Sequence, residues 1–305
     1  MKVSPVDVLN AIYLSMVTLI VIAFHERIDE WYRTPLLFVV YGLAIAAILL
    51  SRRRWPGSRA LRFFHRVYSL FALPFLYKNI EKYVLVFHGH FLDAGMNTWE
   101  RRLFGVYPNL YLEQFVSRPM TEFMMATYFS YYLYVIVPPL ILFGQNRDVA
   151  LERYVFSILF TFYACYLGFL LVPVLGPILS LKHSFARPDL TGYVFAPLQG
   201  FIMEHGDPMG TCFPSSHVAV AWAGILSMRH CFGKKTFWSI LPATICLTVA
   251  VVYNRYHYLS DAIAGLATAV ICNAVCLRVF RSTSLSRRHA GHQSERDRNG
   301  ALTTA

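Results

Sequence analysis

Charged residues are scarce in this chain. Asp, Glu, Lys and Arg make up only 15% of its 305 residues, whereas they make up roughly 25% of an average soluble domain. In their place, 56% of the residues are hydrophobic and 16% are aromatic. This composition excludes an ordinary soluble domain and indicates a protein that lies in a membrane.

The patterns that mark disulfides and metal sites are also missing. The six cysteines include no Cys-x-x-Cys pair, and the histidines show no spacing typical of a zinc or iron site. Four of the cysteines, at positions 165, 246, 272 and 276, fall inside apolar runs, where a free thiol packs as a small hydrophobic side chain. We therefore expect no disulfide, no bound metal and no cofactor.

Long apolar runs recur along the chain. Several of them come close to the roughly 17 to 25 residues that a helix needs to cross a bilayer. The eight runs cover residues 8–24, 35–50, 61–77, 121–143, 154–174, 214–228, 236–253 and 259–279. The third run is the weakest, because Arg62, His65 and Arg66 crowd its start. The sequence thus predicts an all-α polytopic membrane helix bundle with about eight transmembrane helices.

Positive charge collects in three segments of the chain, whose net charge is +11. Residues 51–66 hold six arginines and no acid, a shorter basic cluster separates the sixth and seventh runs, and six more arginines follow from residue 278 onward. With eight crossings, all three segments fall on one side of the membrane, while the opposite loops are close to neutral. The positive-inside rule places the basic side and both chain ends in the cytoplasm. The charge therefore needs no nucleic acid partner to explain it.

Composition divides the chain into three regions. Residues 1–60 would form an accessory transmembrane hairpin with an Arg-rich linker, and residues 61–280 a membrane domain with six crossings. Residues 281–305 are rich in Ser, Arg, His and Asn, so we expect a disordered cytoplasmic tail. Residues 78–120 are too polar to span and too aromatic to be disordered, which favours interfacial helices at the outer surface. Residues 176–211 carry prolines and glycines, which break helices.

Two short polar clusters precede the sixth and eighth apolar runs. The first reads Cys-Phe-Pro-Ser-Ser-His at residues 212–217, and the second reads Arg-Tyr-His-Tyr-Leu-Ser-Asp at residues 255–261. One complete helix separates the two runs, so they point in the same direction and both begin at the outer face. Helix N-termini expose unpaired N–H groups and a partial positive charge, which attract anions. The two helix starts could therefore converge on one phosphate.

The second cluster has the spacing of a catalytic pair. His257 and Asp261 are four residues apart, which places them on one helix face. The carboxylate can then accept the Nδ1 proton of the imidazole and leave Nε2 as a nucleophile or base. This is the role that the carboxylate has in a catalytic triad.

The first cluster complements the second. Pro214 restrains the entry to the helix, Ser215 or Ser216 can cap its first turn, and His217 projects from that turn. Because the leaving oxygen of a phosphoester must be protonated, His217 is the natural general acid.

Each of these features also has a plain structural interpretation. A His-x-x-x-Asp pair occurs by chance in many helices, Pro-Ser-Ser-His is also an ordinary helix cap, and Arg255 could extend to the lipid headgroups. Ionisable residues at membrane depth are nevertheless uncommon and tend to be functional. Their occurrence together at one face is more specific than any of them alone.

Together, the two clusters resemble the motifs of the type 2 phosphatidic acid phosphatase and vanadium haloperoxidase superfamily. The likeness is greatest to the membrane branch that includes inositolphosphotransferases, in which Phe-Pro-Ser-x-His precedes His-Tyr-x-x-Asp. It extends over roughly residues 90–280 and implies a phosphatase-like core of six helices. The resemblance implies that His257 is the nucleophile that forms a phosphohistidine, that Asp261 orients it, and that His217 protonates the leaving group.

The residues that would bind the phosphate match the superfamily less closely. Arg187-Pro188 is present, but the lysine expected seven residues earlier is Ser180, and the arginine expected six residues before the nucleophile is Val251. Ser215 matches a phosphate-contacting position. The candidates for phosphate binding are Arg255, Ser215, Ser216, Arg187 and Lys182.

We therefore expect a lipid phosphate phosphatase or phosphotransferase that acts at the extracytoplasmic face of the cell (plasma) membrane without a metal. Water as the acceptor would make it a phosphatase, and an alcohol such as inositol or a sugar would make it a transferase. Its expected partners are a lipid phosphate substrate and the bilayer. The alternative is a transporter or lipid-binding protein in which the same residues only bind an anion, since helix N-termini also serve transporters.

Overall fold

The regular structure of the chain is helical. The computed structural model describes residues 4–187, 189–206 and 208–302, with side chains described outside 204–205 and 282–302. In these residues, the only pairing of β type is an isolated parallel bridge between Val174 and Thr211. The predicted all-α membrane bundle is confirmed.

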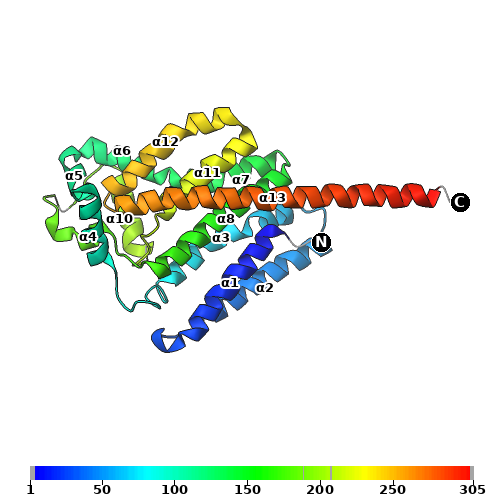
Figure 1. Cartoon of the computed structure of the whole chain (residues 1–305), viewed down its shortest axis with the longest axis horizontal. Coiled ribbons are helices and arrows are strands. Elements are labelled where there is room, and N and C mark those ends of the chain that lie inside the picture. Colours follow the sequence, from blue (N-terminus) through cyan, green and yellow to red (C-terminus); the bar gives the residue numbers. More distant parts are fainter. Residues whose placement is uncertain (1–3, 188, 207, 303–305) are drawn as a thin grey trace.

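The first two helices form a hairpin along one side of the bundle (Figure 1). Helix α1 (Pro5–Ala23) starts with a capping box between Ser4 and Asp7, and a 3-10 turn, η1 (His25–Arg27), leads towards α2 (Arg33–Arg54). Tyr13 of α1 stacks on Tyr163 of α8 (Asp148–Leu171) with ring centroids 3.9 Å apart. Asn10 donates hydrogen bonds to Tyr68 at 3.0 Å and Ser69 at 2.8 Å, which tie α1 to α3 (Arg59–Ile80). The hairpin is thus docked on the core by buried contacts.

Helix α11 (Ser216–Phe232) lies at the centre of the bundle. It packs against α8, α12 (Lys234–Tyr253) and α13 (Leu259–Leu302). Val218, Ala219, Val220 and Ala221 are consecutive residues that are all 0% exposed. A helix that is buried on every side must be apolar on every side, and this explains the small apolar residues that follow His217.

Within the part of the chain that the structure describes, six helical segments are long and apolar enough to cross a membrane. These are Pro5–Ala23, Arg33–Arg54, Arg118–Gly144, Asp148–Leu171, Lys234–Tyr253 and Leu259–Arg281. The two other predicted crossings, α3 and α11, are helical as well. Helix α3 carries the charged residues already noted, and α11 has only 17 residues. Their crossing of the membrane stays a prediction, as does the orientation of the bundle.

The predicted crossing at residues 121–143 consists of two consecutive helices. Helix α6 (Arg118–Phe129) ends and α7 (Tyr131–Gly144) begins at Ser130. Helix α7 contains Pro138, which has no N–H to donate to the carbonyl of Tyr134 one turn earlier. The hydroxyl of Tyr154 donates to that carbonyl at 2.7 Å instead, so a neighbouring helix satisfies the group that the proline leaves unpaired.

Short helices cover the end of the bundle opposite to the start of α1 (Figure 1). They include α4 (Asp93–Phe104), α5 (Pro108–Tyr111) and the 3-10 turn η2 (Leu112–Phe115), in the segment where interfacial helices are predicted. The loop that follows α8 contributes α9 (Pro177–Ser180), η3 (Lys182–Ser184) and α10 (Phe195–Gly206). These elements surround the starts of α11 and α13.

Helix α10 was not expected, because the composition of residues 176–211 argues against helices. Glu122 of α6 accepts hydrogen bonds from the backbone N–H groups of Tyr193, Val194 and Phe195 at 2.7, 2.8 and 2.8 Å. These donors would otherwise be unpaired at the helix start. The cap comes from a residue about seventy positions away, so the local sequence could not reveal it.

The disorder of the C-terminal tail stays a prediction. The backbone of α13 continues as helix to Leu302, through a segment for which we expected disorder. Side chains from residue 282 on lie outside the described residues. The division of the chain into three regions stays a prediction as well.

A glycine allows α13 to approach α11. A Cβ atom on Gly265 would lie 2.5 Å from the backbone oxygen of Ser215 and 3.2 Å from Cβ of Val218. The backbone N–H of Ser215 also donates to the carbonyl of Asp261 at 3.0 Å. The two helix starts that carry the histidines are therefore held in direct backbone contact.

Gly265→Ala is expected to destabilise the fold by about 1–3 kcal/mol, because the new methyl group overpacks this contact. The measurement is the melting temperature of the purified protein in detergent. Gly42→Ala is the matched control, since Gly42 lies in α2 and a Cβ atom there meets nothing within 4 Å. Equal melting temperatures for the two variants would contradict this account of the α11–α13 contact.

Candidate active site

The structure brings the two cluster histidines together. His217 lies in the first turn of α11 and His257 just before α13, and their ring centroids are 5.8 Å apart. His257 is buried. The N-termini of two neighbouring helices thus present two imidazoles to one place.

Two acceptors lie near Nδ1 of His257. The carbonyl oxygen of Cys212 is 3.0 Å from Nδ1, and Oδ2 of Asp261 is 3.5 Å away. Both groups favour the tautomer with the proton on Nδ1. Among the described residues, none is hydrogen-bonded to Nε2, so this nitrogen has its lone pair available.

The position of Asp261 differs in detail from the one expected. Its Oδ2 accepts a hydrogen bond from the backbone N–H of Tyr258 at 2.9 Å, which is shorter than its distance to His257. Its Oδ1 is buried without a partner in the described part of the chain. The nearest acceptor for Nδ1 is therefore a backbone carbonyl from the first cluster, and the carboxylate contributes its charge from slightly further away.

The loop before α13 is held from outside the two clusters. Asn109 donates from Nδ2 to the carbonyls of Val252 at 2.8 Å and His257 at 3.1 Å. Arg255 has a left-handed backbone with φ of 66°, and its carbonyl accepts from Ile178 N at 2.8 Å. This geometry turns the chain between α12 and α13 and fixes the backbone of His257.

Two buried acids of α4 anchor the same region. Asp93 accepts from Leu175 N at 2.8 Å, Gly176 N at 3.0 Å and the hydroxyl of Tyr258 at 2.9 Å.

Glu100 accepts from both the N–H and the hydroxyl of Ser260 at 2.7 Å and so caps the start of α13. Burial raises the pKa of the Glu100 carboxyl, and the hydrogen bonds from Ser260 oppose that change. Neither Asp93 nor Glu100 belongs to the two cluster motifs, so reasoning from those motifs missed this anchoring.

Of the two serines expected to cap the start of α11, Ser215 is the one that does so. Ser215 is the N-cap residue, and its hydroxyl accepts from Val218 N at 3.4 Å. Ser216 begins the helix and is buried beside it. The hydroxyl of Tyr128 lies 2.8 Å from Nε2 of His217, a contact that the sequence did not suggest.

Arg255 and Arg187, two of the phosphate-binding candidates, both lie beside Glu113. Arg255 is buried, donates to the carbonyl of Arg187 at 2.7 Å and pairs with Glu113 at 3.0 Å. Its guanidinium also lies 3.8 Å from the ring centroid of Phe185. Glu113 accepts from Arg187 N at 2.8 Å, and the exposed Arg187 side chain donates to the carbonyl of Val116. Both arginines are therefore already engaged by protein groups.

Lys182 lies in η3 and is exposed. It forms no ion pair among the described residues. Of the basic side chains considered for phosphate binding, Arg255 is thus the one that is buried and held in the loop that carries His257.

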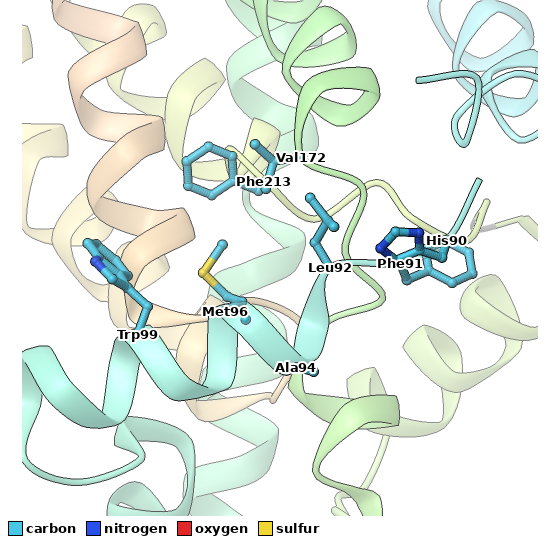
Figure 2. Close-up of a pocket in the computed structure, with 9 residues that line it drawn as sticks. His90, Phe91, Leu92, Ala94, Met96, Trp99, Val172 and Phe213 are labelled. Carbon is cyan, nitrogen blue, oxygen red and sulfur yellow. The ribbon is translucent and has the colours of Figure 1, made fainter. Parts of the chain in front are cut away.

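An apolar pocket of about 540 Å³ lies next to the first cluster (Figure 2). Phe213, which directly follows Cys212, and Val172 form one side, and Met96 and Trp99 of α4 form another. The remaining lining residues are His90, Phe91, Leu92, Ala94 and Gly95. The residues that line this pocket include no lysine or arginine and none of the phosphate-binding candidates, so it does not provide the phosphate site.

Comparison with known proteins gives a consistent result. A family model, described as that of the PAP2 superfamily, matches residues 95–275. A PA-phosphatase related-family protein from Dictyostelium discoideum is 25% identical over an alignment of 183 residues that covers 52% of this chain and 32% of the relative. The chain thus spans about a third of the relative's length. No solved structure matches significantly. The region matched by the family model includes both histidines and leaves out α1 and α2.

Proposed function

The chain belongs to the PAP2 superfamily, and from this membership and the site geometry we propose that it is a membrane lipid phosphate phosphatase or phosphotransferase. Membership supports a phosphatase-like activity in general. The observation that carries the more specific proposal is the pair of imidazoles with centroids 5.8 Å apart, one of which has Nδ1 held and Nε2 available. A nucleophile and an acid on opposite sides of a phosphorus atom need this kind of arrangement.

In the first step, Nε2 of His257 attacks phosphorus. The N–P bond forms, the P–O bond to the lipid alcohol breaks, and His217 gives its proton to the leaving oxygen. The phosphohistidine keeps its proton on Nδ1, which donates a hydrogen bond to the Cys212 carbonyl, and the Asp261 carboxylate balances the charge.

In the second step, water attacks the phosphohistidine and loses a proton to His217. The N–P bond breaks, phosphate leaves, and both histidines return to their starting states. If an alcohol attacks the phosphohistidine in place of water, the phosphoryl group passes to the alcohol and the enzyme is a transferase. Neither step requires a metal ion, because the imidazoles supply the nucleophile, the acid and the base.

The phosphate charge would be met by backbone and by arginine. Ser216 and His217 contribute N–H groups at the unpaired start of α11, where anions are favoured. Arg255 would share its charge between Glu113 and the phosphoryl oxygens. Ser215, Arg187 and Lys182 stay secondary candidates for this role.

The substrate is proposed to be a lipid because the site lies beside helices long and apolar enough to span a bilayer. The distribution of basic residues supports an extracytoplasmic site and cytoplasmic chain ends.

The test is an assay of purified protein in vesicles that contain a panel of lipid phosphates and diphosphates, with a metal chelator present. We expect release of phosphate, or transfer to an added alcohol, with at least one substrate. If no substrate gives either product, the enzymatic proposal is wrong and the anion-binding alternative gains support.

A further inference from the structure

His217 lies between two tyrosines. The ring centroid of Tyr128 in α6 is 4.6 Å from that of His217, and the ring centroid of Tyr131 in α7 is 4.5 Å away. Both tyrosines are buried, and they lie on either side of Ser130, where α6 ends and α7 begins. The imidazole is thus enclosed by two aromatic rings at the start of α11.

Only one of these tyrosines bonds to the imidazole. The Tyr128 hydroxyl is 2.8 Å from Nε2 and 3.4 Å from Nδ1 of His217. No hydrogen bond in the described part of the chain joins Tyr131 to His217. Tyr131 therefore contributes packing, whereas Tyr128 also contributes a directed polar contact.

A phenol suits a histidine that changes its protonation state. The proposed reaction, on which this inference rests, needs His217 as an acid in the first step and as a base in the second. A tyrosine hydroxyl can donate or accept. It can accept from Nε2–H while His217 is protonated and donate to Nε2 once the proton has gone. A carboxylate partner would only accept and would favour the charged form.

We propose that Tyr128 is a positioning residue for His217, whose hydroxyl holds the imidazole in one orientation through both protonation states. The leaving oxygen of the substrate meets the same edge of the ring and shares the Nε2 proton with Tyr128. An imidazole fixed in this way needs no reorientation when the leaving oxygen arrives.

The test uses Tyr128→Phe, which keeps the buried ring and removes the hydroxyl. Its kcat/KM is compared on two substrates, an alkyl lipid phosphate and nitrophenyl phosphate. An alkoxide must be protonated as it leaves, whereas nitrophenolate is stable without a proton. Because kcat/KM includes only the steps up to departure of the leaving group, it isolates the contribution of the acid.

We expect kcat/KM of Tyr128→Phe to fall about tenfold or more on the alkyl phosphate, as a fraction of the usual general-acid effect. On nitrophenyl phosphate it should stay close to that of the wild-type protein. Equal losses on both substrates would indicate a merely structural role and overturn the inference, and so would no loss on either.

Tyr134→Phe is the matched control. Like Tyr128, Tyr134 is buried, but it lies in α7. Its hydroxyl is hydrogen-bonded to Thr244 at 2.8 Å, away from the histidines. Its kcat/KM should change equally on both substrates. If the wild-type protein turns over neither substrate, with water or with an added alcohol as acceptor, the proposed function itself fails and the inference fails with it. If it turns over both, the result for Tyr128→Phe decides the inference alone.

Discussion

His257→Ala is expected to lower phosphate release from a lipid phosphate by about a thousandfold or more, because it removes the nitrogen that we propose forms the covalent intermediate. Alanine at this position leaves the backbone hydrogen bonds of the loop in place, since Asn109 bonds to the carbonyl of residue 257 and not to its side chain. The measurement is the initial rate of phosphate release from vesicles.

His230→Ala is the control for this variant, since His230 is exposed near the far end of α11. It should keep wild-type activity and the same melting temperature. His257→Ala also separates the two classes of function, because a protein that only binds anions has no covalent step to lose. A variant at position 257 that stays folded and retains most of the turnover would contradict the nucleophile assignment.

His217→Ala is the second variant with a large expected effect. General acid–base catalysis typically contributes about 10²- to 10⁴-fold, and a loss in this range is expected for kcat/KM on an alkyl lipid phosphate. The loss on nitrophenyl phosphate should be much smaller, because its leaving group needs no proton.

The second step gives this variant a further signature. Without His217 to take a proton from water, the phosphohistidine should break down slowly. With nitrophenyl phosphate as substrate, we therefore expect phosphoenzyme to accumulate in His217→Ala to a higher level than in the wild-type protein. Equal sensitivity to both substrates, with no accumulation, would show that His217 does not act as acid and base.

The sequence predicted those features of the site that depend on local spacing. The spacing of four predicted that His257 and Asp261 meet, and they do, although His257 lies two residues before α13 and not on a helix face as expected. Ser215 caps α11 because serine accepts from a backbone N–H two or three residues on. The apolar runs predicted the helices, because a chain in a bilayer must satisfy its backbone hydrogen bonds internally.

Contacts between distant segments could not be predicted in this way. The Cys212 carbonyl at Nδ1 of His257, the Tyr128 hydroxyl at His217 and the Glu122 cap of α10 each join residues at least 45 positions apart. Nothing in the local sequence around any of these residues indicates its partner. The motifs therefore predicted which histidines meet, and the fold decides which groups hold them.

The basic residues illustrate the same limit. Charge and spacing suggested Arg255 and Arg187 as phosphate ligands, but the sequence could not reveal that Glu113 accepts from the guanidinium of Arg255 and from the backbone N–H of Arg187. An arginine that is already paired contributes less new charge to a bound phosphate. The first-turn N–H groups of α11 therefore have a larger part in our account of phosphate binding than the sequence suggested.

The central claim is that His257 carries the phosphoryl group. The most direct measurement is to incubate the His217→Ala protein with phosphate-labelled nitrophenyl phosphate, quench it in alkali and locate the label by mass spectrometry of its peptides. Phosphohistidine survives alkali and is lost in acid. We predict acid-labile label on the peptide that contains His257 and none in the double variant that also carries His257→Ala. Label on another residue, or turnover without any covalent label, would contradict the account.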